Sequence, residues 1–466
     1  MASGIMNISL SALNASLSGM RTVQHNIANA NTEGYHRQVL SFKATTPQFF
    51  GGGFYGTGVQ VEVARRVYDD FLSRQAQNYQ AQLSSGQAYA SFSTQVDALL
   101  GGESSGLGQP IQAFFSAVNE VVNDPTSLVA RQQMLSAGGN LAGRFNVLAD
   151  GLQDYNAALN KEIANIASQI NRYAGQIQSL NVQIASAVGA GGEPNDLLDQ
   201  RDQAVAELNK LIGVTQTDQG DGTIAVRLAR GQALVDGASV NQVVPVNNSS
   251  GQLVLAFDLP NTTATEIIPD ADITGGRLGG LLAFRSEVLN PSISDLDTMA
   301  MAFSTAFNDQ HLLGYALDGS AGGHFFTDLA GTGSTAAAKD IAVLISDPGM
   351  VAAASAPGIG DNANAVALAG LRGTAFITSG TNSYTLSDYN TNMVGRNASA
   401  ANSADNNVTM YSTLYQSAYD AEQAVSGVNL DEEAMDLIRY QQAYQAAAKA
   451  IQTSTKMFEE VLNIIR

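Results

Sequence analysis

The sequence predicts a mainly α-helical chain with a β-rich insert, an α+β fold in which long coiled-coil-like helices come from both termini. Three observations support this fold class. Apolar residues recur at heptad spacing near both ends of the chain, and at near-heptad spacing over residues 141–184. Between residues 214 and 275 the pattern changes to the alternation of strands. Because helix precedes and follows the insert, we expect nested domains with the β-rich part as an outer lobe.

Chain length sets the number of domains that we expect. The 466 residues suffice for roughly three domains of about 150 residues each. We expect residues 1–60 with 406–466 to form an inner coiled-coil domain. Residues 61–213 with 276–330 are expected to form a helical rod-like domain, and residues 214–275 with 331–405 an outer β-rich and loop domain.

The first helix is predicted from a heptad stripe near the N-terminus. Its members step by four and three residues, with Gln24 filling one place: Met6, Leu10, Leu13, Leu17, Met20 and Ile27. We expect the helix to end near Asn29–Asn31, since Asn-rich sequence and Gly34 are typical of helix ends. The other faces carry mostly small and uncharged polar residues, which neighbouring subunits can cover with little charge desolvation. The stripe is therefore a candidate assembly surface.

The last helix is predicted from a longer stripe of the same spacing over residues 434–465. Asn429 is placed to cap its start, with Glu432 three residues on. We expect the stripes of the first and last helices to pair with each other and to pack on neighbouring subunits. The candidate assembly residues of the last helix are Leu437, Tyr444, Ile451, Phe458, Leu462 and Ile465.

The interior begins and ends with helix. Helices are predicted over residues 61–100, 111–122, 128–188 and 195–212, with breaks at Asp124-Pro125 and at Gly189–Pro194. Alternation predicts strands over 223–229 and 253–259, and helix returns over 278–313. Residues 319–405 are rich in Gly, Ala, Ser, Thr and Asn, so short strands and loops are expected there. Helix resumes near Val408.

Composition excludes several classes of protein. With 23 Lys and Arg against 42 Asp and Glu, the net charge is −19, which opposes a nucleic-acid partner. The sequence has no Cys, which excludes disulfides and Cys-ligated metals, and its four His lack metal-ligand spacing. We expect no cofactor and no metal. No apolar run reaches about 18 residues and no signal peptide is recognisable, so these signals alone predict a cytosolic protein without a membrane span.

The motifs that could carry chemistry have simpler explanations. The glycines from Gly51 to Gly58 are expected to form a flexible connector, and Asp218–Gly222 a hairpin turn instead of a calcium loop. His311 and His324 are expected to serve in packing or turns. We expect Asp196, Asp199, Arg201 and Asp202 on a solvated helix face. An enzyme is therefore not expected.

One segment after the first helix resembles a known family. The stretch Asn26-Ile-Ala-Asn-Ala-Asn-Thr-Glu-Gly-Tyr35 resembles, in type and position, the signature of bacterial flagellar rod, hook and hook-associated axial proteins. Its turn residues are Asn29, Asn31, Thr32, Gly34 and Tyr35. Further stretches resemble the members at the hook–filament junction: 123–132, 195–202, 279–326, 426–433 and 439–444. The chain looks shorter than many members, and we expect a reduced outer domain.

The resemblance implies a non-enzymatic structural protein of the flagellum. Such members self-associate in a ring between hook and filament, with hook protein below and a second junction protein or filament above. It also implies unfolded export through the flagellar type III apparatus without a cleaved signal, helped by a small chaperone. The chaperone is expected to bind the same residues of the C-terminal helix that are candidates for assembly: Leu437, Tyr444, Ile451, Phe458, Leu462 and Ile465. The expected location is then extracellular, on the flagellum, which reverses the cytosolic prediction. The lack of Cys is compatible with passage through a narrow channel.

Three alternatives stay open. A hook protein or distal rod protein shares the signature and a similar last helix. An extracellular adhesin with a helical stalk shares the layout, but it needs an anchor or a cleavable signal. An enzyme with a site built from Asp221, His311 and His324 is conceivable, although no pattern supports it.

Overall fold

The computed structural model describes residues 2–249, 251–258, 265–333 and 335–465. It is mainly helical with a β-rich insert, which confirms the predicted fold class. The chain forms two compact units. Unit 1 comprises Met1–Leu83, Ala167–Gly276 and Tyr411–Arg466, and unit 2 comprises Ser84–Ile166 and Arg277–Met410. Three long helices contribute residues to both units: α2 (Asp70–Gly101), α4 (Leu128–Gly189) and α11 (Leu386–Ser426).

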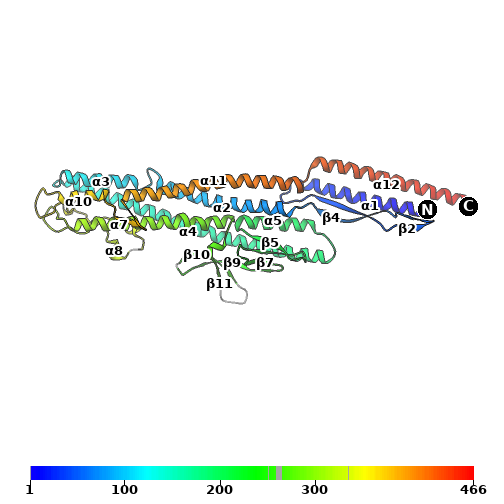
Figure 1. Ribbon diagram of the computed structural model, residues 1–466, viewed down its shortest axis with the longest axis horizontal. Coiled ribbons are helices and arrows are strands. Elements are labelled where there is room, and N and C mark those ends of the chain that lie inside the picture. Colours follow the sequence, from blue (N-terminus) through cyan, green and yellow to red (C-terminus); the bar gives the residue numbers. More distant parts are fainter. Residues whose placement is uncertain (1, 250, 259–264, 334, 466) are drawn as a thin grey trace. The chain divides into compact units, whose positions relative to one another are not determined.

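The two terminal helices lie side by side in unit 1 (Figure 1). They are α1 (Ala2–Asn29) and α12 (Leu430–Ile465), and both predictions of helix are confirmed. The pair is antiparallel, because Gly19 lies against Tyr440 while Asn26 bonds Glu433. The predicted cap is confirmed as well, since the Asn429 side chain accepts from the backbone N–H of Asp431 at 3.0 Å.

The face of α1 that is buried differs from the predicted one. It is a stripe of small or polar side chains: Ser9, Ser16, Gly19, Val23 and Asn26. Small side chains let two helices approach closely, and a Cβ added at Gly19 would lie 2.6 Å from the Tyr440 ring. The most buried face of α1 is therefore not the predicted apolar stripe. In that stripe, which we call the α1 stripe, three side chains are exposed and three half-buried: Met6, Leu10 and Ile27, then Leu13, Leu17 and Met20.

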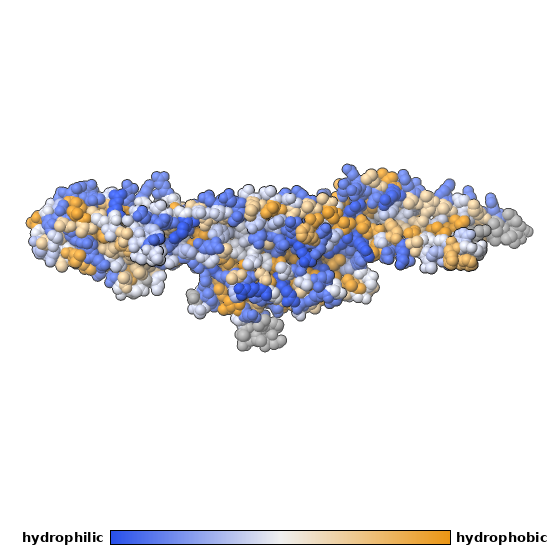
Figure 2. Space-filling model, viewed as in Figure 1, coloured by the Kyte–Doolittle hydropathy of each residue, from blue (hydrophilic) through white to orange (hydrophobic). Residues whose placement is uncertain are grey.

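On α12, the predicted stripe is partly on the face toward α1. Leu437, Tyr444 and Ile451, which are seven residues apart, are half-buried. Ala447 and Ser454, each three residues further on from one of them, are buried, so together they follow a heptad pattern. Phe458 is exposed, and the side chains of Leu462 and Ile465 lie outside the described residues. Figure 2 shows apolar residues on the surface of the part of unit 1 that contains these two helices.

A β-ribbon follows α1. Strand β1 (Gln38–Ala44) pairs antiparallel with β4 (Val59–Arg66), in the register Gln38 opposite Arg66. Between them lies a hairpin of β2 (Gln48–Phe50) and β3 (Gly53–Tyr55), so the prediction of a connector is wrong for Gly51, Gly52 and Gly53. Gly56 and Gly58 lie in the short connection to β4. The prediction of helix from residue 61 is wrong over the first residues. The alternation of Val59, Val61 and Val63 matches the period of a strand.

The insert of unit 1 consists of two small antiparallel sheets. The first has the order β5 (Thr215–Asp218), β6 (Ile224–Arg227), β7 (Ala233–Asp236), β8 (Ser239–Val240), and the second β11 (Thr265–Ile268), β10 (Leu253–Asp258), β9 (Gln242–Asn247). The predicted hairpin turn after Asp218 is confirmed, because the Asp221 side chain accepts from Thr223 N–H at 2.8 Å. The Asn181 amide of α4 donates to Ile224 O at 2.9 Å, which anchors the first sheet on the helix.

Unit 2 is mainly helical, and its described residues include one short hairpin. Besides parts of the long helices it contains the helices α3 (Gly108–Asn123), α6 (Gly276–Phe284), α7 (Asn290–Leu312), α8 (Leu329–Thr332), α9 (Ala337–Asp340) and α10 (Ala363–Gly370). The π-helix η2 (Arg285–Leu289) joins α6 to α7, and the hairpin consists of β12 (Ile377–Ser379) and β13 (Asn382–Tyr384). Single 3₁₀ turns are η1 (Asp270–Asp272), which belongs to unit 1, η3 (Pro348–Met350) and η4 (Leu371–Gly373).

The region 331–405 differs most from the prediction. The sequence grouped it with 214–275, but 214–275 falls in unit 1 and 331–405 in unit 2. Helix α11 begins at Leu386 and not near Val408. Its first half is rich in Asn and Ser, which are poor helix formers, and it is stabilised by burial of residues at helical spacing: Leu386, Tyr389, Met393, Asn397, Ala401 and Ala404.

The core of unit 2 contains six phenylalanine rings around α3 and α7: Phe114, Phe115, Phe303, Phe307, Phe325 and Phe326. His311 is fully buried beside them, with Nδ1 2.7 Å from Gly323 O and Nε2 accepting from Ala352 N–H at 2.9 Å. This confirms the packing role. Burial, with a smaller contribution from the Arg131 cation, lowers the pKa of His311 to about 4.

No helix within the described residues is long and apolar enough to cross a membrane.

We predict that Gly19→Ala destabilises the α1–α12 pair by about 1–3 kcal/mol, because the new methyl group collides with the Tyr440 ring. In a Tyr440→Ala background the same change should stabilise by up to ~1 kcal/mol, since Ala favours helix over Gly. Thermal unfolding followed by circular dichroism measures both. Gly4→Ala is the control, because nothing in the described structure lies within 4 Å of its added Cβ. Additive effects of the first two substitutions would contradict the contact.

We predict that the stability of unit 2 falls as the pH drops from about 6.5 to about 4. Folded His311 stays neutral down to about pH 4, whereas the unfolded imidazole titrates near 6.5, so the unfolded state binds more protons in this range. The loss should approach about 2–3 kcal/mol. Unfolding midpoints across this pH range should decline less steeply in His311→Gln, while exposed His324→Gln should behave as the native chain does. Equal slopes in all three proteins would exclude His311 as the cause.

Candidate functional site at the signature turn

The turn that follows α1 is held by its own residues. The Thr32 N–H donates to Asn29 O at 2.9 Å, and the Asn29 amide donates to His25 O at 3.0 Å. Gly34 has φ +77°, a conformation that favours glycine, and its added Cβ would lie 3.3 Å from Gln203 of α5 (Asn195–Leu211). Asn31 is exposed. These predicted residues thus form a tight turn against α5.

Asn26 is the hub of the site. Its side chain is almost fully buried, and each of its polar atoms has two partners. The Nδ2 group donates to Gln38 O at 2.9 Å and to Glu433 Oε2 at 3.0 Å. The Oδ1 atom accepts from the Tyr35 hydroxyl at 2.7 Å and from Gln38 N–H at 3.0 Å. One amide therefore joins α1, the turn, β1 and α12.

Glu433 receives a second donor from the ribbon side. Its side chain is only 1% exposed, and its Oε1 accepts from Arg37 Nε at 2.7 Å. The same guanidinium reaches Glu432 at 3.1 Å. Arg37 N–H also donates to Ser426 O at 2.9 Å, at the last residue of α11. Arg37 therefore fixes the junction between α11 and α12, and a buried carboxylate with two donors is well compensated.

The far side of the turn is held by α5. Asp199 accepts from the His36 backbone N–H at 3.2 Å, lies 2.7 Å from His36 Nδ1, and accepts from Arg66 Nη1 at 3.0 Å. Arg66 also pairs with Asp202 at 2.5 Å. The Asn195 amide donates to Ala64 O at 2.7 Å. The Gln38 amide of β1 donates to Asp196 Oδ1 at 2.8 Å, so the start of α5 is tied to both strands of the ribbon.

The expectation of a solvated charged face is wrong for most of these residues. Asp199, Arg201 and Asp202 are buried, and only Asp196 keeps a largely exposed side chain. The ribbon and the turn cover Asp199 and Asp202, which pair with the Arg66 guanidinium. The Arg201 guanidinium instead donates to Gly222 O at 2.6 Å and to Asn181 Oδ1 at 3.3 Å. The stretch 195–202 thus provides the acidic side chains that hold the signature turn.

Two tyrosines in the site have shifted ionisation. Burial, followed by the Asp196 and Asp199 charges, raises the pKa of Tyr35. Burial and the Asp202 charge raise the pKa of Tyr68 to about 12. Tyr68 packs edge-on against His36, with ring centroids 5.2 Å apart, and under the Arg66 guanidinium at 4.4 Å. Both phenols therefore stay neutral over the physiological pH range, and the Tyr35 hydroxyl remains a donor to Asn26.

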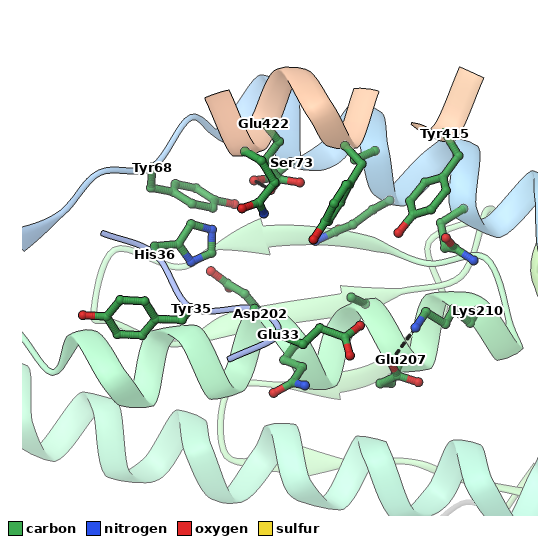
Figure 3. A pocket seen from close by; sticks show the side chains of 18 residues that line it. Glu33, Tyr35, His36, Tyr68, Ser73, Asp202, Glu207, Lys210, Tyr415 and Glu422 are labelled. Carbon is green, nitrogen blue, oxygen red and sulfur yellow. Dashed lines mark hydrogen bonds and ion pairs between the residues drawn. The ribbon is translucent and has the colours of Figure 1, made fainter. Parts of the chain in front are cut away.

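A small pocket opens beside the turn, within unit 1. Its volume is about 110 Å³, and Figure 3 shows its labelled lining: Glu33, Tyr35, His36, Tyr68, Ser73, Asp202, Glu207, Lys210, Tyr415 and Glu422. Its charged groups are largely engaged, as in the Glu207–Lys210 pair at 2.6 Å. Within the described residues no three His, Cys, Asp or Glu side chains are grouped as metal ligands. The contacts described for these residues hold segments of the chain together.

The predicted site residues fall into separate places. Asn29, Thr32, Gly34 and Tyr35 meet at the turn, whereas the α1 stripe lies outside it. Sequence reasoning missed the residues that carry most of the contacts: Asn26, Arg37, Arg66, Asp199 and Glu433. Two signals were present in the chain, namely the position of Asn26 at the start of the signature and the presence of Asp199 and Glu433 in two stretches of the same resemblance.

Two of the residues named in the enzyme alternative are engaged in other contacts. Asp221 belongs to unit 1 and His311 to unit 2, and each uses its polar atoms in local backbone hydrogen bonds.

Comparison with known proteins connects this architecture to the flagellum. Residues 93–326 match the family model described as the flagellar hook-associated protein FlgK helical domain, and residues 423–464 match the flagellar basal body rod FlgEFG protein C-terminal model. Flagellar hook-associated protein 1 of Salmonella typhimurium strain LT2 is 31% identical over 554 positions, which cover 99% of this chain and all of the relative. The Bacillus subtilis strain 168 relative is 30% identical, over 97% of this chain and 96% of its own length.

A solved structure has the same fold. The flagellar hook junction protein FlgK from Burkholderia pseudomallei superposes with a TM-score of 0.69 at 20% identity, over 76% of this chain and all of that chain. The 554 aligned positions exceed the 466 residues of this chain by 88, so the Salmonella relative carries residues that have no counterpart here.

We predict that Asn26→Asp destabilises unit 1 by about 2–4 kcal/mol, because it removes an amide donor and places a carboxylate beside buried Glu433. Chemical denaturation measures the change in the free energy of unfolding. Asn14→Asp is the matched control, since Asn14 is exposed on the same helix, and it should change stability by less than about 0.5 kcal/mol. Equal effects of the two substitutions would show that Asn26 is not a hub.

Proposed function

Because the chain belongs to the flagellar hook-associated protein 1 family, we propose that it is a structural protein of the bacterial flagellum that forms the junction between hook and filament and is needed for filament assembly. This proposal rests mainly on sequence similarity to these relatives, which extends over 99% of the chain and includes both terminal helices. The hook and distal rod alternative has less support, because the rod-type model matches only residues 423–464. The family is structural, so the role is non-enzymatic.

The terminal helices are the proposed assembly elements. The α1 stripe leaves Met6, Leu10 and Ile27 exposed, and α12 leaves Phe458 exposed, although the two helices pair with each other. Burying a Leu, Ile or Phe side chain fully contributes about 1.5–3 kcal/mol before entropy costs. Burial of these exposed side chains between neighbouring copies would favour self-association in a ring. The hook protein lies below this ring and a second junction protein or filament above it.

Export precedes assembly in this proposal. The chain leaves the cell unfolded through the flagellar type III apparatus, without a cleaved signal, and is extracellular once mounted on the hook. A small export chaperone holds the last helix beforehand, as an amphipathic helix in a groove. The exposed apolar residues of α12 supply side chains for that groove: Met435, Ile438, Met457 and Phe458.

We predict that cells without this gene keep their hooks and shed filament subunits into the medium. Electron microscopy of the cells and immunoblots of the culture medium measure this. Complementation with the full chain should restore filaments, and a chain that lacks residues 434–465 should not. Normal filaments in the deletion strain would overturn the junction role. The truncated chain should also fail to retain the chaperone in a pull-down, and unchanged retention would contradict only the chaperone proposal.

A further inference from the structure

The hairpin of β2 and β3 presents aromatic side chains to solvent. Phe49, Phe54 and Tyr55 are 65%, 75% and 60% exposed. The rings of Phe49 and Phe54 stack edge-on across the two strands, with centroids 5.2 Å apart. No atom of the described structure lies within 4 Å of a Cβ built at Gly51 or Gly52, so the tip stands clear of its own chain. Clustered exposed apolar surface of this kind is typical of interaction sites.

The hairpin is also free of charge. Residues 44–58 contain no Asp, Glu, Lys or Arg, in a chain whose net charge is −19. Two copies of so acidic a protein repel each other over most of their surfaces. Copies can therefore meet most favourably where both surfaces lack charge. This favours a second copy of the chain as the occupant, provided that the chain offers a second uncharged apolar surface.

The α1 stripe is such a surface. Residues 2–20 contain no charged side chain, and Met6 and Leu10 are exposed there. The ribbon lies on the other side of the helix, because Ser11 Oγ accepts from Val59 N–H at 3.2 Å and Ile8 lies beside Gly58. Successive residues of an α-helix are about 100° apart around its axis, so the side chains of the α1 stripe point, on average, roughly 180° away from those of residues 8 and 11. Each copy thus carries the hairpin on one side of α1 and the stripe on the opposite side.

We propose that the β2–β3 hairpin of one copy packs on the α1 stripe of the next copy, with the hairpin aromatic rings covering Met6, Leu10 and Leu13. The two surfaces are different, so the contact is head-to-tail and generates a ring or a helical turn and not a closed pair. This inference rests on the proposed function, because it names the contact that would join neighbouring copies in the junction.

Disulfide cross-linking tests the contact directly, since the native chain has no Cys. A Phe54→Cys chain and a Leu10→Cys chain, with tags of different size, are co-expressed in a strain that lacks the native gene. Hook–filament particles are purified, oxidised and separated on a non-reducing gel. Each chain has one Cys, so every disulfide joins two copies. We expect a mixed dimer of the two tagged chains, and little of it when Phe71→Cys, an exposed aromatic position outside the hairpin, replaces Phe54→Cys.

Assembled particles without the mixed dimer would overturn the proposal, as would dimers of the Phe54→Cys chain alone. If the Cys chains do not assemble, a second variant tests the same contact. The triple change Phe49→Ser, Phe54→Ser and Tyr55→Ser should leave the unfolding midpoint unchanged and lower incorporation into flagella at least tenfold, whereas Phe71→Ser should not. Native incorporation of the triple variant would also overturn the contact. The proposed function fails separately, if the native chain is absent from purified hook–filament junctions.

Discussion

The carboxamide of Asn26 is the interaction on which unit 1 depends. It bonds Glu433 in α12, Gln38 in the ribbon and Tyr35 in the turn, so four segments share one buried group. Neither an apolar nor a charged residue of similar size offers two donors and two acceptors in this geometry. Glu433 in turn holds Arg37, which fixes the end of α11. The signature thus connects the terminal helices to the remainder of unit 1 through buried polar contacts.

The two faces of α1 differ because one of them packs against α12 and the other remains on the surface. The inward face is small and polar where it meets α12, which permits close approach at Gly19 and leaves the large apolar side chains for other surfaces. A monomer that buried Met6 and Leu10 internally would be more stable but would have less apolar surface for neighbouring copies. Exposure of such residues at uncharged positions is consistent with a protein that completes its apolar burial in an assembly.

Sequence patterns predicted what depends on local periodicity. Both terminal helices, the Asn429 cap, the helical hairpin of α4 and α5 and the turn at Asp221 follow from spacing and turn residues. The inward face of α1 could not be chosen, because the small stripe and the apolar stripe share the same heptad period. The burial of Asp199 depends on Arg66, 133 residues away, and that of Glu433 on Arg37, 396 residues away. The start of α11 depends on packing that overrides weak propensity.

The bond between Asn26 and Glu433 spans 407 residues of sequence. Almost the whole chain must therefore be present before α1 can bury its small face. During synthesis, or during any end-first passage through a channel, whichever terminus emerges first waits without its partner. The closure of this loop makes the terminal pair a late event in folding. A chain that ends before Glu433 would consequently lack this contact, and the small face of α1 would have no α12 to pack against.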